Sequence, residues 1–312
     1  MDAIEALGLP PSQWIDLDGP VHYREWVGPA DGPTFVLVHG LGGSLLNWAG
    51  VAPGLAEWGR VVAVDLAGFG LTPLEGRSAG VSANRRLLRG FLHTLELPKV
   101  VLVGNSMGGM VSMLQAARDP DSVRALILVD AAFPRGRVRA SQFSPKVAAL
   151  FAAYSVSLVG ERVARWRQRR LGAEGLVHET LRLCAPHPER IDPTLVAALI
   201  EQARLRMEFD YATPAFLEAA RAIFRANVAP AKYRSLVRSV PHPALVIHGD
   251  QDRLVPVGGA TEAARAHANW TLEVLPGLGH IPQMEAPELW LEKVEAWLPS
   301  ILEPSEIATK SS

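Results

Sequence analysis

Hydrophobic and polar positions follow two patterns along the chain, one typical of buried strands and one typical of helices. Runs of apolar, β-forming residues predict strands at residues 21–27, 34–38, 60–65, 99–103, 124–129, 243–248 and 270–275. The inner runs are nearly continuous Val, Leu and Ile, as in strands buried on both faces of a parallel sheet. Helical spacing appears at residues 82–95, 107–118, 257–268 and 286–299. Because strands and helices alternate, we predict an α/β fold with a mostly parallel central sheet flanked by helices.

The alternation stops between about residues 134 and 230, where the apolar spacing is helical throughout. The charge changes there too: residues 134–234 carry 17 Lys and Arg against 9 Asp and Glu, whereas the remainder carries 14 against 23. We interpret residues 134–230 as an all-helical cap (lid) over the strand ends, and residues 1–133 and 231–302 as the core. The polar segment 303–312 is expected to be a flexible tail.

Composition narrows the class of protein. The chain has 312 residues, 48% of them hydrophobic, and a net charge of −1, which fits one large globular unit with an insertion. No apolar run approaches the roughly 20 residues that cross a bilayer, and the N-terminus lacks the features of a signal peptide. We therefore expect a cytoplasmic protein with no transmembrane segment and no nucleic-acid partner. The composition does not indicate an oligomeric state.

Cysteine and arginine usage adds two smaller points. Cys184 is the only cysteine, so the chain has no internal disulfide framework and no cysteine cluster of the kind that binds zinc. We expect neither a metal nor a cofactor. Four arginines at positions 165, 167, 169 and 170 make one end of a predicted cap helix cationic. A solvated helix face is the favoured interpretation, and a weak peripheral membrane contact through the basic cap is left open.

The strongest chemical signal is a serine between a predicted strand and a predicted helix. Residues 104–108 read Gly-Asn-Ser-Met-Gly, directly after the apolar run at 99–103 and before the helical run at 107–118. Glycines allow a turn so tight that a Cβ would clash, and the turn leaves the serine hydroxyl exposed at its tip. We therefore predict that Ser106 is a nucleophile. The alternative is an ordinary turn with a serine N-cap.

A serine nucleophile needs a base and a carboxylate that orients the base. His280 follows the strand at 270–275 and is the predicted base. Asp252 follows the strand at 243–248 and is the predicted acid, with Asp130, after the strand at 124–129, as its competitor. The chain order Ser, Asp, His is the order typical of a serine on a strand-to-helix elbow.

The tetrahedral intermediate of acyl transfer carries an oxyanion that needs backbone N–H donors. Met107, the residue after the nucleophile, is one predicted donor, and Leu41, in the loop His-Gly-Leu-Gly-Gly-Ser, is the other. Glycines in this loop let the backbone approach a substrate. Further candidates for the substrate pocket are Gly40, Gly42, Trp48, Asn105 and Ile281. A core position for Trp48 and a turn-forming role for Asn105 are left open as alternatives.

Together, HGLGGSLLNW, VDLAGFGLT, GNSMGG, HGDQDRLVP and GLGH resemble the α/β-hydrolase superfamily, in its serine-nucleophile branch. The resemblance spans residues 35–285 and implies the family fold, with the cap inserted after the sixth strand of its sheet. Haloalkane dehalogenases and epoxide hydrolases of this superfamily carry an aspartate where this chain has Ser106, so their chemistry is disfavoured.

The resemblance leads to one expected function and three alternatives. We expect a carboxylesterase without a cofactor, whose partners are a small-molecule ester and water. Carbon–carbon hydrolases of meta-cleavage diketones share a GNSMGG-like elbow, but usually have an HGSGPG-like loop and a Trp after the catalytic His, where this chain has Ile281. Cofactor-free haloperoxidases (perhydrolases) and a non-catalytic ligand-binding module on the same fold complete the alternatives.

Overall fold

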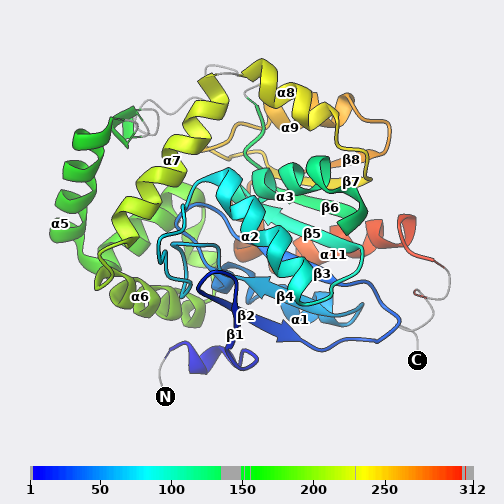
Figure 1. The fold of residues 1–312 in the computed structure, drawn as a ribbon, viewed down its shortest axis with the longest axis horizontal. Coiled ribbons are helices and arrows are strands. Elements are labelled where there is room, and N and C mark those ends of the chain that lie inside the picture. The colour runs from blue at the N-terminus through cyan, green and yellow to red at the C-terminus, as the bar shows by residue number, and fades with distance from the viewer. Residues whose placement is uncertain are drawn as a thin grey trace.

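A twisted sheet of eight strands forms the centre of the computed structural model, which describes residues 3–134, 149–150, 152–154, 156–228, 230–303 and 306 (Figure 1). The strand order is β1-β2-β4-β3-β5-β6-β7-β8. Strands β3 to β8 pair in parallel, whereas β1 pairs with β2, and β2 with β4, in antiparallel fashion. Their bounds are β1 Gln13–Asp16, β2 Pro20–Trp26, β3 Phe35–Val38, β4 Val61–Val64, β5 Val100–Asn105, β6 Val123–Val129, β7 Ala244–Gly249 and β8 Trp270–Leu275.

The predicted fold class and strand positions are confirmed for β2 to β8. Strand β1 was not predicted from the sequence. It has only four residues, its burial alternates between half-buried and exposed, and it pairs at the edge of the sheet with β2 alone. An edge strand of this kind lacks the continuous apolar run that identifies the inner strands.

Alternate residues of the central strands enter two hydrophobic cores, one on each face of the sheet, and a third, smaller core contains residues of β2 and β4. Val101 and Val103 of β5 pack in the core that also contains residues of α1 (Ala52–Ala56) and α11 (Pro287–Trp297). Leu102 packs on the other face, in the core with residues of α2 (Val81–Thr94), α3 (Met107–Arg118) and α9 (Gly258–Arg265). Because helices cover both faces, the strand ends are the part of the sheet that remains for a site.

Between β6 and β7 the chain forms helices α5 (Ser157–Cys184), α6 (Pro193–Met207), α7 (Ala212–Val228) and α8 (Pro230–Arg238), which we call the helical insertion. In Figure 1, α5 to α7 lie to one side of the sheet. The division into core and cap at residues 133 and 230 stays a prediction, and residues 135–148 of the predicted cap lie outside the described residues. Among the described residues, no helix combines the length and the apolar character that crossing a membrane requires.

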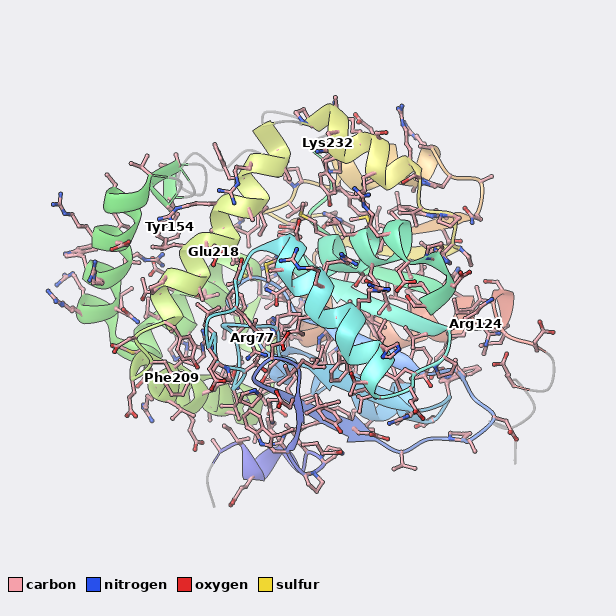
Figure 2. The ribbon with its side chains drawn as sticks, viewed as in Figure 1. Arg77, Arg124, Tyr154, Phe209, Glu218 and Lys232 are labelled. Atoms are coloured by element: carbon pink, nitrogen blue, oxygen red, sulfur yellow. The ribbon has the colours of Figure 1, made fainter. Side chains whose placement is uncertain are left out.

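The predicted tail, residues 303–312, lies mostly outside the described residues. Glu306 is described, and its carboxylate accepts hydrogen bonds from Arg124, whose Nη1 and Nη2 lie 2.5 and 2.7 Å from the carboxylate oxygens (Figure 2). Arg124 also donates to the carbonyl of Ile301.

Polar contacts join the helical insertion to loops that follow the central strands. Arg206 of α6 donates from Nη1 to the Gly70 carbonyl at 2.9 Å and from Nη2 to the Gly68 carbonyl at 2.8 Å, in the loop after β4. Its guanidinium also lies 5.8 Å from the centre of the Phe69 ring. Glu218 of α7 accepts the backbone N–H of Ala79 at 3.0 Å, just before α2 (Figure 2). These contacts fix the insertion close to the strand ends.

Replacing Arg206 tests this contact. Arg206→Ala leaves two backbone carbonyls without their charged donor, so we expect the free energy of unfolding to fall by about 2 kcal/mol. The matched control is Arg204→Ala on the same helix, because the Arg204 side chain is 65% exposed and lies 3.8 Å from the carboxylate of Glu174, whose side chain is equally exposed. That control should change stability by less than about 1 kcal/mol. Urea denaturation of both variants measures the difference, and equal losses would contradict the role of Arg206.

Candidate active site

Ser106 lies between β5 and α3 in a backbone conformation that few non-glycine residues adopt. Its φ is 54° and its ψ is −114°. Its N–H donates to the Val129 carbonyl of β6 at 3.0 Å, and its carbonyl accepts the N–H groups of Met110 and Ala132. Such strain persists only where the surrounding structure enforces it, and it occurs most often at functional sites. The predicted sharp turn at Ser106 is therefore present, with the side chain half-buried at its tip.

The glycines of this elbow are required by close backbone contacts. A Cβ on Gly108 would lie 2.0 Å from the Val38 carbonyl oxygen of β3, and a Cβ on Gly104 would lie 2.6 Å from the Gly108 backbone. Gly109 is similarly confined, because its Cβ would lie 2.5 Å from the Ala131 side chain. Helix α3 can therefore pack this tightly against β3 and β5 only with glycine at these positions.

The two predicted oxyanion donors lie next to the elbow. Met107 is the first residue of α3, so its N–H has no partner within the helix. Leu41 belongs to the loop after β3, and this loop touches the elbow, since a Cβ on Gly40 would lie 3.2 Å from the Ser106 Cβ. Gly42 has a φ of 74°, which favours glycine. Among the described residues, neither the Leu41 nor the Met107 N–H has a hydrogen-bond partner.

His39 holds this loop in place, a role that we did not predict from the sequence. It is fully buried, and its Nε2 accepts the Leu66 N–H at 3.1 Å, so that Nδ1 carries the proton and donates to the Gly40 carbonyl at 2.8 Å. Burial lowers the pKa of His39, in agreement with a neutral ring. The signal in the sequence was a histidine directly after a buried strand and directly before a glycine loop.

The structure brings the predicted base and acid into direct contact. Asp252 Oδ2 lies 2.7 Å from His280 Nδ1, and both residues are buried. The other oxygen of Asp252 accepts the N–H groups of Leu254 at 2.7 Å and Val255 at 3.0 Å. Burial alone would raise the pKa of Asp252, but the nearby His280 and these hydrogen bonds hold that pKa below its usual value. Asp252 is therefore a fixed carboxylate aimed at the imidazole.

Asn105 connects His280 to the elbow. Its side-chain amide donates to the His280 carbonyl at 3.0 Å and to the Val129 carbonyl at 3.1 Å, and the residue is buried. The backbone of the histidine is thereby tied to the residue that precedes Ser106. Ser106 Oγ makes no hydrogen bond to a described residue, as is common before a substrate binds.

Asp130 and His248 form a second buried layer behind Asp252. Asp130 Oδ1 accepts the Gly249 N–H at 3.0 Å, while its Oδ2 has no partner among the described residues. His248 Nε2 donates to the Val255 carbonyl at 2.7 Å and lies 3.5 and 3.6 Å from Asp130 and Asp252. Burial, and then the negative charge of Asp252, raises the pKa of Asp130 well above its ordinary value. Of the two carboxyl groups, Asp130 therefore holds a proton more readily and Asp252 ionises first.

These three side chains also have the composition of a metal site, because their ligand atoms lie within 4.8 Å of one another. Their polar atoms, however, already hold backbone N–H groups, the Val255 carbonyl and His280. The three side chains therefore form a partly hydrogen-bonded acid cluster around the base, in which Asp130 Oδ2 and His248 Nδ1 have no partner among the described residues.

Two predicted pocket residues lie in the core. Trp48 is fully buried, and its ring centre lies 6.4 Å from that of Trp290. Ile281 is buried in the same core at the start of α10 (Pro282–Glu285). By contrast, Gly42 faces the helical insertion, since a Cβ at this position would lie 3.2 Å from the Phe216 ring of α7. Phe216 is thus an apolar neighbour of the candidate oxyanion loop.

Comparison with known proteins gives one family and several relatives. The family model described as alpha/beta hydrolase fold matches residues 33–287. The chain is 29% identical over 87% of its length to the dihydrolipoyllysine-residue acetyltransferase component of the acetoin cleaving system of Pseudomonas putida, and it spans 65% of that relative. It is 28% identical to the 2-hydroxymuconate semialdehyde hydrolase of Pseudomonas sp. (strain CF600), over 81% of this chain and 82% of the relative. A thermophilic esterase from Thermogutta terrifontis is similar in structure, with 25% identity, a TM-score of 0.66 and coverage of 93% of this chain and 99% of the esterase.

The state of Asp130 can be tested by stability at different pH values. The folded protein keeps the Asp130 proton well above pH 3.8, whereas the unfolded chain releases it near that value. In this interval the folded state binds more protons, so this residue makes the wild type less stable as the pH rises. Asp130→Asn is neutral at every pH, and we expect its free energy of unfolding to fall less steeply as the pH rises above 3.8. Urea denaturation measures both slopes, and identical slopes would show that Asp130 is not protonated.

Proposed function

The chain belongs to the α/β-hydrolase family, and from this premise we propose that it is a serine hydrolase that cleaves carboxylic esters of small to medium acyl chain. The observation that carries the proposal is the buried His280–Asp252 pair, with 2.7 Å between Nδ1 and Oδ2, tied through Asn105 to the strained elbow at Ser106. A nucleophile, a base and an orienting acid are the three groups that acyl transfer through a serine requires.

The proposed reaction has two halves. Ser106 Oγ attacks the ester carbonyl while His280 Nε2 takes the hydroxyl proton, and Asp252 stabilises the imidazolium that forms. The N–H groups of Leu41 and Met107 bind the oxyanion of the tetrahedral intermediate. His280 then gives its proton to the leaving alkoxide, so an alcohol departs and an acyl-enzyme remains. In the second half, His280 activates water, which releases the carboxylic acid and restores Ser106.

The surroundings of the candidate oxyanion loop support an apolar acyl group. Phe216 lies against Gly42, and its ring forms an edge-to-face pair with Tyr154, with 5.4 Å between the ring centres. Leu41 packs at the edge of the same hydrophobic core as Phe216. An aromatic and aliphatic wall beside the reacting carbonyl favours a hydrocarbon chain over a charged group.

The proposal includes the cellular setting. We propose water and a small-molecule ester as the partners of the reaction and the cytoplasm as its place, which the single cysteine supports. The basic surface of α5 stays a candidate for weak membrane contact.

One alternative has a specific observation in its favour. A relative that aligns with 81% of this chain is named 2-hydroxymuconate semialdehyde hydrolase. The GNSMGG elbow supports this carbon–carbon hydrolase alternative. The loop HGLGGS, and Ile281 after His280, favour the ester reaction instead.

Replacing the nucleophile tests the proposal directly. We expect Ser106→Ala to lower kcat for p-nitrophenyl butyrate by about 10⁴-fold or more. The reason is that His280 then has no serine hydroxyl to deprotonate, so no acyl-enzyme forms. Labelling by a fluorophosphonate probe should also disappear. Ser112→Ala in α3, the helix that follows Ser106, is the matched control, since Ser112 is buried and its Oγ has no partner among the described residues. Retained turnover in Ser106→Ala, at wild-type stability, would refute the assignment.

A substrate panel separates the two reactions. With p-nitrophenyl esters of acetate, butyrate, hexanoate and decanoate beside one ring-fission dienoate, we expect kcat/KM to be highest for a short or medium ester. The reason is that the apolar wall at Phe216 binds an acyl chain and provides no charged group for a dienoate carboxylate. Steady-state kinetics on all five compounds measures the order. A dienoate turned over faster than every ester would support the carbon–carbon alternative instead.

A further inference from the structure

His280 lies in the loop of residues 276–281, which we call the histidine loop. Backbone N–H groups of this loop donate hydrogen bonds to two separate elements. The Gly279 N–H donates to Glu285 Oε1 of α10 at 2.8 Å. The next N–H along the chain, that of His280, donates to the Cys184 carbonyl at 2.6 Å. Cys184 is the last residue of α5, so one contact comes from the core and the other from the helical insertion.

There is little free space around these contacts. A Cβ on Gly279 would lie 2.1 Å from the Cys184 carbonyl oxygen and 2.7 Å from Cδ of Pro186. On the other side, a Cβ on Gly249, at the end of β7, would lie 2.1 Å from the Gly279 carbonyl oxygen. The histidine loop is therefore clamped between the end of α5 and the end of β7, and a small shift of either side moves the His280 backbone.

Glu285 is an unusual group for a structural contact. It is 3% exposed, and its Oε2 has no hydrogen-bond partner among the described residues. Burial raises its pKa to about 7, although the N–H groups of Gly279 and His187 and the charges of His187 and Arg190 lower it. The other titratable groups around it are Cys184 at the end of α5 and Asp130 after β6. A buried carboxyl whose Oε2 has no partner is costly, and the bond from the Gly279 N–H to Oε1 offsets part of this cost.

We propose that Glu285 is a positioning residue for His280: by holding the Gly279 N–H it sets the backbone from which the imidazole reaches Asp252, and it does so against the end of α5. The inference rests on the proposed function, in which His280 is the base. As a consequence, a movement of the helical insertion would also move His280, since the Cys184 carbonyl and Glu285 bind adjacent N–H groups of the histidine loop.

The test compares Glu285→Met with Glu285→Gln. Methionine has nearly the same length but cannot accept the Gly279 N–H, so His280 loses its fixed position. We expect kcat for p-nitrophenyl butyrate to fall by about 10- to 100-fold with KM changed little, because misplacement of a reacting group by about 1 Å costs rate rather than binding. Glutamine keeps an acceptor oxygen, and we expect Glu285→Gln to recover most of kcat.

The matched control is Gln283→Met on α10. Gln283 is fully buried, and its side-chain nitrogen and oxygen have no partner among the described residues. The control therefore places the same side chain in the same helix without breaking a bond to the histidine loop, and its kcat should equal that of the wild type. If Gln283→Met loses as much kcat as Glu285→Met, the effect belongs to the packing of α10 and the inference is wrong.

The pH profile provides a second readout that holds even where Glu285→Met does not fold. Glu285 titrates near pH 7 in the wild type, so the profile of kcat/KM contains its ionisation. Glu285→Gln should lose that ionisation, whereas Glu288→Gln, which removes an exposed carboxylate of α11, should not. A Glu285→Gln profile superimposable on the wild type, or a wild-type kcat in Glu285→Met, overturns the inference. Loss of activity in Ser106→Ala alongside such a result would leave the proposed function intact.

Discussion

The contact between the backbone of α3 and the backbone of β3 is the constraint on which the rest of the site depends. Gly108 lies so close to the Val38 carbonyl that a Cβ would be 2.0 Å from its oxygen. This approach places the first turn of α3 directly behind the end of β5, and it forces Ser106 into a positive φ of 54°. The hydroxyl and the free N–H of Met107 then occupy the centre of the sheet edge. Without the contact between Gly108 and Val38, the strained turn at Ser106 would not form, and the neighbouring loops would not be positioned around it.

Around this turn, single hydrogen bonds from different elements place each remaining group. His39 orients the loop of Leu41, and Asn105 holds the His280 carbonyl. One oxygen of Asp252 accepts two backbone N–H groups, while the other contacts the imidazole of His280. The raised pKa of Asp130 and the lowered pKa of Asp252 favour a single negative charge, on Asp252, next to a base that becomes positive during the reaction. Glu285 and the end of α5 close the arrangement by fixing the histidine loop.

The sequence was sufficient to predict the features that depend on local pattern, and insufficient for those that depend on packing. The inner strands β3 to β7 have nearly continuous apolar runs, and Gly-Asn-Ser-Met-Gly between a strand and a helix identifies the elbow, so both could be predicted. Strand β1 is short and half-exposed and gave no such run. Trp48 packs beside Trp290 in the core, and this contact between residues distant in sequence could not be predicted from a local pattern. The raised pKa of Asp130 depends on its burial and on Asp252, which is distant in sequence. The contact of Glu285 depends on a buried environment that no local pattern reveals.

The central claim is that Ser106 Oγ becomes acylated during turnover, and one measurement tests it most directly. Wild-type protein is mixed with p-nitrophenyl butyrate, quenched in acid within milliseconds to seconds, and digested with trypsin. The account predicts a butyryl group on the peptide of residues 100–118, which follows Lys99 and ends at Arg118, with fragmentation placing it on Ser106 and not on Ser112. Its amount should rise to a plateau and decay as substrate is consumed. Steady release of butyrate with this peptide unmodified at every time point would contradict the account.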